Sequence, residues 1–149
     1  MTVEIDQSWR FERTNRPTVV GLSNGKTYAI VIPARVKKAA FRYVEAKHGR
    51  QTMNVIRLFA ASVLILLKSS RVGNQHFLID TEYVGHEKDV KDLLSELAPK
   101  ENIVLDLDRL RFGRVGKKSG AHKVAIETFR KKRNPNKIVQ LEELVRLLA

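Results

Sequence analysis

A short apolar run that ends in an acid restricts the fold more than any other feature of this sequence. The run Phe77-Leu78-Ile79-Asp80 has the composition of a buried strand, and a helical pattern follows after a turn at Gly85. The apolar positions of that pattern are three or four residues apart: Val90, Leu93, Leu94 and Leu97. Open α/β sheets build their sites at the carboxyl ends of such strands, so Asp80 is the first candidate for chemistry. A second interpretation stays open, because an Asp at a strand end is often only a turn former or a helix N-cap.

The segments before this run predict three antiparallel strands. Partly alternating apolar residues predict a first strand over Thr2–Glu12, with Asp6 near its middle. Two further strands, Thr18–Leu22 and Thr27–Ile32, flank an Asn24-Gly25 pair, the strongest short signal for a hairpin.

The remaining segments alternate helices with strands. Helical patterns cover Ala34–Lys47, then Gln51 to about Lys68, and Pro99 ends the helix that follows Asp80. The segment Asn102–Val115 is ambiguous: its period shifts, which indicates a bulge or turn near Asp108. A helix capped by Ser119 and a short terminal helix complete the chain. Three antiparallel strands followed by this alternation predict one α/β domain over residues 1–149, with a mixed sheet and helices on both faces.

The charge of the chain indicates a polyanionic partner. Lysine and arginine total 28 against 16 acids, a formal charge of +12. Such an excess suits nucleic acid, an anionic membrane surface, or merely a well-solvated surface, and we expect nucleic acid. The absence of cysteine excludes disulfides, Cys-ligated zinc and a Cys nucleophile. It also fits a cytoplasmic location, and no signal peptide is expected at the N-terminus. The longest apolar run, Leu58–Leu67, is half of the ~20 residues that a spanning helix needs, so we expect a buried helix and no membrane partner.

The order of these elements resembles the ribonuclease H-like superfamily. Val3-Glu4-Ile5-Asp6 is similar to the family's first strand with its carboxylate, and the stretch from Leu78 to Val84 is similar to its fourth strand. The segment that begins Thr52-Met53-Asn54 resembles the start of its central helix, and the segment Ala121–Ala125 lies where the family starts its last helix. The resemblance implies a five-stranded mixed sheet. Each motif is short, and their order carries the resemblance.

One position departs from the family pattern. The central helix of the family usually carries a glutamate, and this chain has Arg57 there. Glu45 on the preceding helix or Glu82 could substitute, and Glu82 shares the face of Asp80 if the strand continues. The missing acid leaves open a non-catalytic module that only binds nucleic acid.

The resemblance implies a metal-dependent nuclease that hydrolyses phosphodiester bonds in an RNA–DNA hybrid or in structured nucleic acid. Two Mg²⁺ or Mn²⁺ ions would be held by Asp6, Asp80 and Glu82, since hard cations prefer oxygen ligands. The expected catalytic residues are Asp6, Asp80 and His122, although a His at a helix start is as often bonded to backbone. Four basic residues are expected to hold phosphates: Arg111, Arg114, Lys117 and Lys118.

Overall fold

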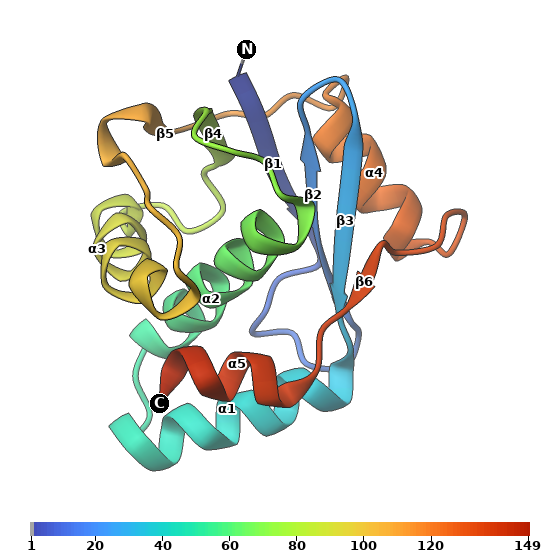
Figure 1. Cartoon of the computed structure of the whole chain (residues 1–149). Coiled ribbons are helices and arrows are strands. Elements are labelled where there is room, and N and C mark those ends of the chain that lie inside the picture. Colours follow the sequence, from blue (N-terminus) through green and yellow to red (C-terminus); the bar gives the residue numbers. More distant parts are fainter. Residues whose placement is uncertain (1) are drawn as a thin grey trace.

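A mixed six-stranded sheet forms the centre of the computed structural model, which describes residues 2–149 (Figure 1). The strand order is β5-β4-β1-β2-β3-β6. The strands are β1 (Thr2–Ser8), β2 (Thr18–Ser23), β3 (Thr27–Ile32), β4 (His76–Asp80), β5 (Leu110–Gly113) and β6 (Lys137–Ile138). β1, β2 and β3 are antiparallel to their neighbours in that trio, whereas β4 is parallel to β1 and β5 is parallel to β4. The predicted α/β class and the antiparallel-then-parallel arrangement are therefore confirmed.

The prediction of five strands is wrong by one short strand. β6 contains two residues and pairs in parallel with Ile30 and Val31 of β3. It extends the antiparallel edge of the sheet. A two-residue strand is too short to show a period of two, so the sequence pattern could not reveal it.

The helices cover both faces of the sheet, as predicted (Figure 1). α4 (Gly120–Phe129) packs on one face against β1, β2 and β3. The other face carries the main core around α2 (Met53–Ser70), with α1 (Ala34–His48), α3 (Glu87–Leu97) and α5 (Leu141–Leu148) packed about it. Two 3₁₀ turns, η1 (Ala98–Glu101) and η2 (Leu107–Arg109), lie between α3 and β5. The second turn contains Asp108, where the sequence pattern indicated a bulge or turn.

α2 is the central core helix. Every residue from Leu58 to Leu67 is buried. The hydroxyl of Ser62 donates to the Leu58 carbonyl at 2.8 Å, and this hydrogen bond offsets the cost of burying a polar group in the core. By length and composition α2 is the one helix within residues 2–149 that could cross a membrane, but 67% of it is buried inside the protein. The prediction that this run is a buried helix is confirmed.

The first strand is shorter than predicted. It ends at Ser8 because Trp9 has a φ of 72°, which turns the chain out of the sheet. Phe11 nevertheless reaches the core from the loop after β1, where it is fully buried and contacts the ring of Phe59. The alternation of Trp9 and Phe11 therefore reflects loop residues that pack inward, and it does not extend the strand.

A glycine in β2 allows α4 to lie unusually close to the sheet. A Cβ atom at Gly21 would be 2.8 Å from Val124 Cγ1 and 2.9 Å from the carbonyl oxygen of Ala121, distances that real side chains do not tolerate. The absence of a side chain at this position lets the first turns of α4 settle against β1 and β2. This close packing places His122 over the end of β1.

Candidate active site

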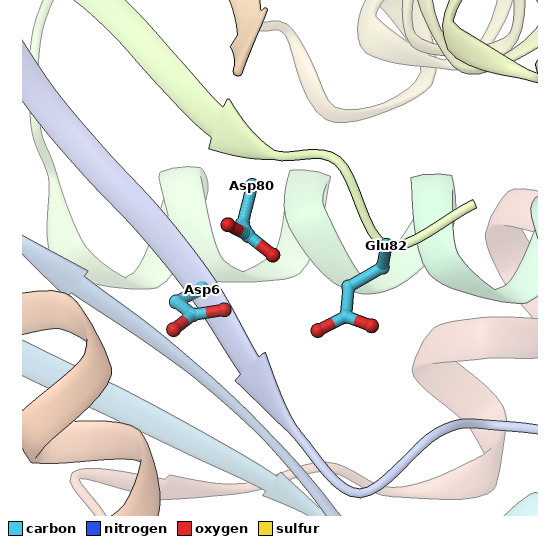
Figure 2. Close-up of side chains that lie close together, drawn as sticks. All are labelled: Asp6, Asp80 and Glu82. Atoms are coloured by element: carbon cyan, nitrogen blue, oxygen red, sulfur yellow. The ribbon is translucent and has the colours of Figure 1, made fainter. Parts of the chain in front are cut away.

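Three carboxylates come together at the carboxyl ends of β1 and β4 (Figure 2). Asp6, Asp80 and Glu82 each offer an oxygen, and these oxygens all lie within 4.8 Å of one another. In Figure 2 the three side chains point into one shared space, Asp6 from β1, Asp80 from the end of β4 and Glu82 from the loop that follows. The structure thus brings together the three residues that were predicted as metal ligands.

The parallel pairing of β1 with β4 places the two aspartates. Ile5 pairs with Ile79, so the next residues, Asp6 and Asp80, are neighbours on adjacent strands and face the same side of the sheet. That side is the face covered by α4, while Ile5 and Ile79 are buried in the main core. The backbone N–H of Val115 donates to Asp80 Oδ1 at 2.8 Å and fixes the rotamer of that carboxylate.

Glu82 reaches the cluster from a turn and not from a longer strand. β4 ends at Asp80, and the N–H of Glu82 donates to the Asp80 carbonyl at 2.9 Å. The Arg10 guanidinium donates to the Glu82 carbonyl at 3.3 Å, which ties this turn to the loop after β1. The strand therefore does not continue to Glu82, but the turn brings its carboxylate to the same place.

His122 joins the cluster from α4. Its Nδ1 donates to Asp6 Oδ2 at 2.9 Å, and the Asp6 side chain is only 6% exposed. This contact is with a carboxylate, so the alternative of a helix-start histidine bonded to backbone does not hold. The capping of α4 by Ser119, whose hydroxyl accepts from the Ala121 N–H, is confirmed and sets where the helix begins.

Burial and like charge both act on the acids. Burial raises the pKa of Asp6, the neighbouring Asp80 charge raises it further, and the His122 hydrogen bond opposes the shift. The pKa of Glu82 is also raised, first by burial and then by the charges of Asp80 and Asp6, while Arg10 opposes the shift. The cluster therefore holds acids whose negative charge is under-compensated, an arrangement that a bound cation would relieve.

An open cleft of about 700 Å³ exposes this cluster to solvent. Two of the four predicted phosphate-binding residues, Arg114 and Lys117, line it together with the three acids and His122. Arg111 and Lys118 are exposed but do not line the cleft. The cleft thus has an acidic floor and a partly basic rim.

Three residues that no sequence pattern indicated support the site. Gln7 lines the cleft, and its buried Oε1 has no hydrogen-bond partner among residues 2–149. Tyr83 accepts hydrogen bonds from Gln7 Nε2 at 3.2 Å and from the Phe11 N–H at 3.3 Å. The Arg10 guanidinium lies 4.9 Å from the centre of the Tyr83 ring. Gln7 could have been noticed, since it follows Val3 and Ile5 at an inward position where an apolar residue is expected.

Arg57, at the position of the missing glutamate, and Glu45 both lie away from the three acids. Arg57 donates to Asn54 Oδ1 at 2.8 Å and to Gln51 Oε1 at 3.1 Å, and it does not line the cleft. Glu45 is exposed on α1 beside a separate hollow. The part of α2 nearest the acids is apolar, since Phe59 contacts the Tyr83 ring. Of the two possible substitutes, only Glu82 lies with the aspartates.

Comparison with known proteins found no matching family model, no matching curated protein and no matching solved structure.

Proposed function

We propose that this protein is a metal-dependent nuclease that hydrolyses phosphodiester bonds in nucleic acid, with an RNA–DNA hybrid as the first substrate to test. The observation that carries this proposal is the meeting of Asp6, Asp80 and Glu82 within 4.8 Å in an open cleft of a chain with charge +12. Carboxylates that converge from separate strands are the ligands of two-ion phosphodiester hydrolysis. The net positive charge of the chain attracts a polyanion electrostatically, although the floor of the cleft is acidic.

The donor set fits a hard divalent cation such as Mg²⁺ or Mn²⁺. All three side chains offer carboxylate oxygen, which these ions prefer, and the chain has no cysteine to supply a thiolate ligand. When bound, such ions supply Lewis acidity and lower the pKa of a water molecule that attacks phosphorus.

The residues of the chain have separate roles in this proposal. Asp6, Asp80 and Glu82 hold the cations, and the Val115 N–H keeps the Asp80 carboxylate aimed at them. His122 orients Asp6, and with Nδ1 donating to that carboxylate a neutral imidazole keeps its lone pair on Nε2, available to accept a proton. The cationic side chains of Arg114 and Lys117 bind phosphate oxygens at the rim.

We also propose that the fold is of the ribonuclease H-like type. Support comes from the sheet, in which three antiparallel strands are followed by two strands parallel to the first, with β1 and β4 adjacent at the acids. β6 and α5 are additions at the far edge and the C-terminus under this proposal.

A second candidate function is non-catalytic binding of nucleic acid on the same scaffold. One observation favours it: α2, which would supply the family's glutamate, contains no acidic residue. The cluster then has three carboxylates and no fourth from the central helix. Binding without cleavage in every divalent cation would support this candidate.

The test is cleavage of a labelled RNA–DNA hybrid with Mg²⁺, with Mn²⁺ and with EDTA. We expect cleavage only with the divalent ions, and we expect Asp80→Asn to abolish it while the circular dichroism spectrum stays unchanged. Arg57→Gln is the matched control, because Arg57 lies outside the cleft. Cleavage by the Asp80→Asn protein, or cleavage in EDTA, would contradict the proposed metal-dependent mechanism.

A further inference from the structure

The loop between β1 and β2 displays arginines on a surface next to the cleft. Lys37 on α1 is fully buried, and its ammonium donates to the carbonyl oxygens of Arg10 at 3.2 Å, Arg13 at 2.8 Å and Arg16 at 3.0 Å. Burial lowers the pKa of Lys37 to about 8, so the ammonium remains charged at neutral pH. One buried cation thus fixes the backbone at three arginines of the same loop, which removes much of the loop's conformational freedom.

Two of these arginines stand over a pair of stacked aromatic rings. Trp9 and Phe129 are 5.4 Å apart with an interplanar angle of 15°. The Arg13 guanidinium is 5.7 Å from the Trp9 ring, and that of Arg16 is 5.6 Å from Trp9 and 4.9 Å from Phe129. The Trp9 indole N–H donates to the Arg13 carbonyl at 3.0 Å and holds the ring in place. We call these four residues the arginine platform.

The guanidinium edges of the platform are free for a ligand. Arg13 and Arg16 are both exposed, and among residues 2–149 neither side chain has a carboxylate or hydrogen-bond partner. Arg10 in the same loop differs, since its Nε lies 3.2 Å from Glu12 Oε2. A cation–π contact uses the face of a guanidinium and leaves its N–H edge open for bidentate bonds to phosphate.

The platform lies along α4 from the candidate active site. Phe129 follows His122 by seven residues, which places the two on the same side of the helix and about 10 Å apart at 1.5 Å per residue. Trp9 follows Asp6 by three residues along the chain. The exposed basic run Arg130-Lys131-Lys132-Arg133 continues from Phe129. Under the proposed function, a nucleic-acid strand with its scissile phosphate in the cleft could place a neighbouring part of its backbone at this surface.

We propose that the arginine platform binds backbone phosphates of the nucleic-acid substrate and sets its path out of the cleft. This inference rests on the proposed function for the identity of the ligand. It assigns to Arg13 and Arg16 a binding role that the sequence did not indicate, and it makes Trp9 and Phe129 positioning residues that hold the guanidiniums in place.

The experiment measures binding without cleavage. An Asp80→Asn protein in EDTA is titrated into a fluorescein-labelled RNA–DNA hybrid, and anisotropy gives Kd at several salt concentrations. Adding Arg13→Gln and Arg16→Gln should weaken binding about tenfold and reduce the slope of log Kd against log salt by about 1.5, because two phosphate contacts are lost. The matched control, Arg42→Gln with Arg50→Gln, removes the same charge from exposed arginines outside the cleft and should change Kd by less than about twofold.

Two further measurements separate placement from charge. Phe129→Leu keeps every charge but removes a ring beneath Arg16, so it should weaken binding about threefold with little change in the salt slope. Trp9 is the sole tryptophan, so its fluorescence should change on addition of the hybrid and not on addition of inorganic phosphate alone. Equal weakening by the platform pair and the control pair would overturn the proposal, and so would unchanged binding by the platform pair. Absence of cleavage in every metal, with this binding pattern intact, would overturn only the nuclease function.

Discussion

Two buried acidic sites in this protein are built in opposite ways. The side chain of Glu101 in η1 is only 3% exposed. Its carboxylate forms ion pairs with Lys68 Nζ at 2.6 Å and with the Arg146 guanidinium at 2.9 Å. Burial tends to raise its pKa, but the hydrogen bonds and charges of these two cations outweigh burial and lower it. Asp6 is almost as buried, yet its neighbours are Asp80, Glu82 and one histidine, and its pKa is raised.

The contrast separates an acid whose charge is compensated inside the protein from acids that we propose bind a cation. Glu101 ties α2, η1 and α5 together, and its charge is compensated inside the protein. The acids at the ends of β1 and β4 face a cleft and lie beside one another, so their charge is not compensated in the same way. A cluster of this kind costs stability in the free protein, which is expected where a site is built for a ligand.

Activity provides the largest expected difference between the two sites. Asp6→Asn should reduce metal-dependent cleavage of a hybrid by at least about 1000-fold, because an amide oxygen carries no charge to hold a divalent ion. Glu101→Gln should leave the rate per folded molecule unchanged, measured at a temperature where both proteins are folded. Loss of activity in both variants to the same extent would show that the sites do not differ in this way.

Glu101→Gln, which should keep its activity, should instead lose stability. Glu101→Gln leaves Lys68 and Arg146 without their carboxylate, and both cations are more than half exposed and can be rehydrated, so we expect the free energy of unfolding to fall by about 1–2 kcal/mol. Urea unfolding followed by circular dichroism measures this change. Glu96→Gln is the control, because Glu96 is an exposed acid on α3 without an ion pair among residues 2–149. A loss no larger than that of Glu96→Gln would contradict a structural role for Glu101.

Much of the fold followed from local sequence patterns. The Asn24-Gly25 turn and the apolar alternation around it fixed the antiparallel strands, and the run from Leu58 to Leu67 indicated the core helix. The patterns failed where tertiary contacts decide the structure. Phe11 is buried from a loop, and Lys137–Ile138 becomes a strand only because β3 offers an open edge.

The candidate site was partly visible because each acid follows a strand. Asp6 and Asp80 lie near the ends of two apolar strands, and the parallel pairing that joins them is a common arrangement. The polar support was hidden, because the contact of Arg10 with the Glu82 carbonyl spans 72 residues and leaves no local pattern. The arginine platform was hidden for the same reason: Trp9 and Phe129 are far apart in sequence.

Lowering the pH should reduce the contribution of Glu101 to the free energy of unfolding and increase that of the acids in the cleft. The pKa of Glu101 is lowered from its ordinary value of 4.5, so its stabilisation is present above that value and is lost as the pH falls through the lowered one. The pKa values of Asp6 and Glu82 are raised, so the folded state takes up their protons first and gains stability as the pH falls through this window. Urea unfolding at a series of pH values should therefore show the deficit of Glu101→Gln shrinking below pH 4.5. If the stability difference between Glu101→Gln and the parent protein stays constant down to the lowest pH at which both are folded, the lowered pKa of Glu101 would be contradicted.

The smallest expected effect is a gain in stability on removal of an acid from the cleft. Asp80→Asn keeps an oxygen to accept from the Val115 N–H and removes one of three neighbouring negative charges, so the free energy of unfolding should rise by about 0.5–1 kcal/mol at neutral pH. The gain should disappear as Asp6 and Glu82 become protonated in acid.

Mg²⁺ should make the unsubstituted protein more stable than Asp80→Asn, the reverse of the order expected without metal. In the unsubstituted protein a concentration ten times Kd adds about 1.4 kcal/mol, because only the folded state presents the three carboxylates together. Asp80→Asn should gain little from Mg²⁺, whereas Glu101→Gln should gain as much as the parent, with NaCl of equal ionic strength as the reference. If Asp80→Asn is less stable than the parent without metal, the acids of the cleft hold the fold together as Glu101 does, and the distinction between the two sites fails.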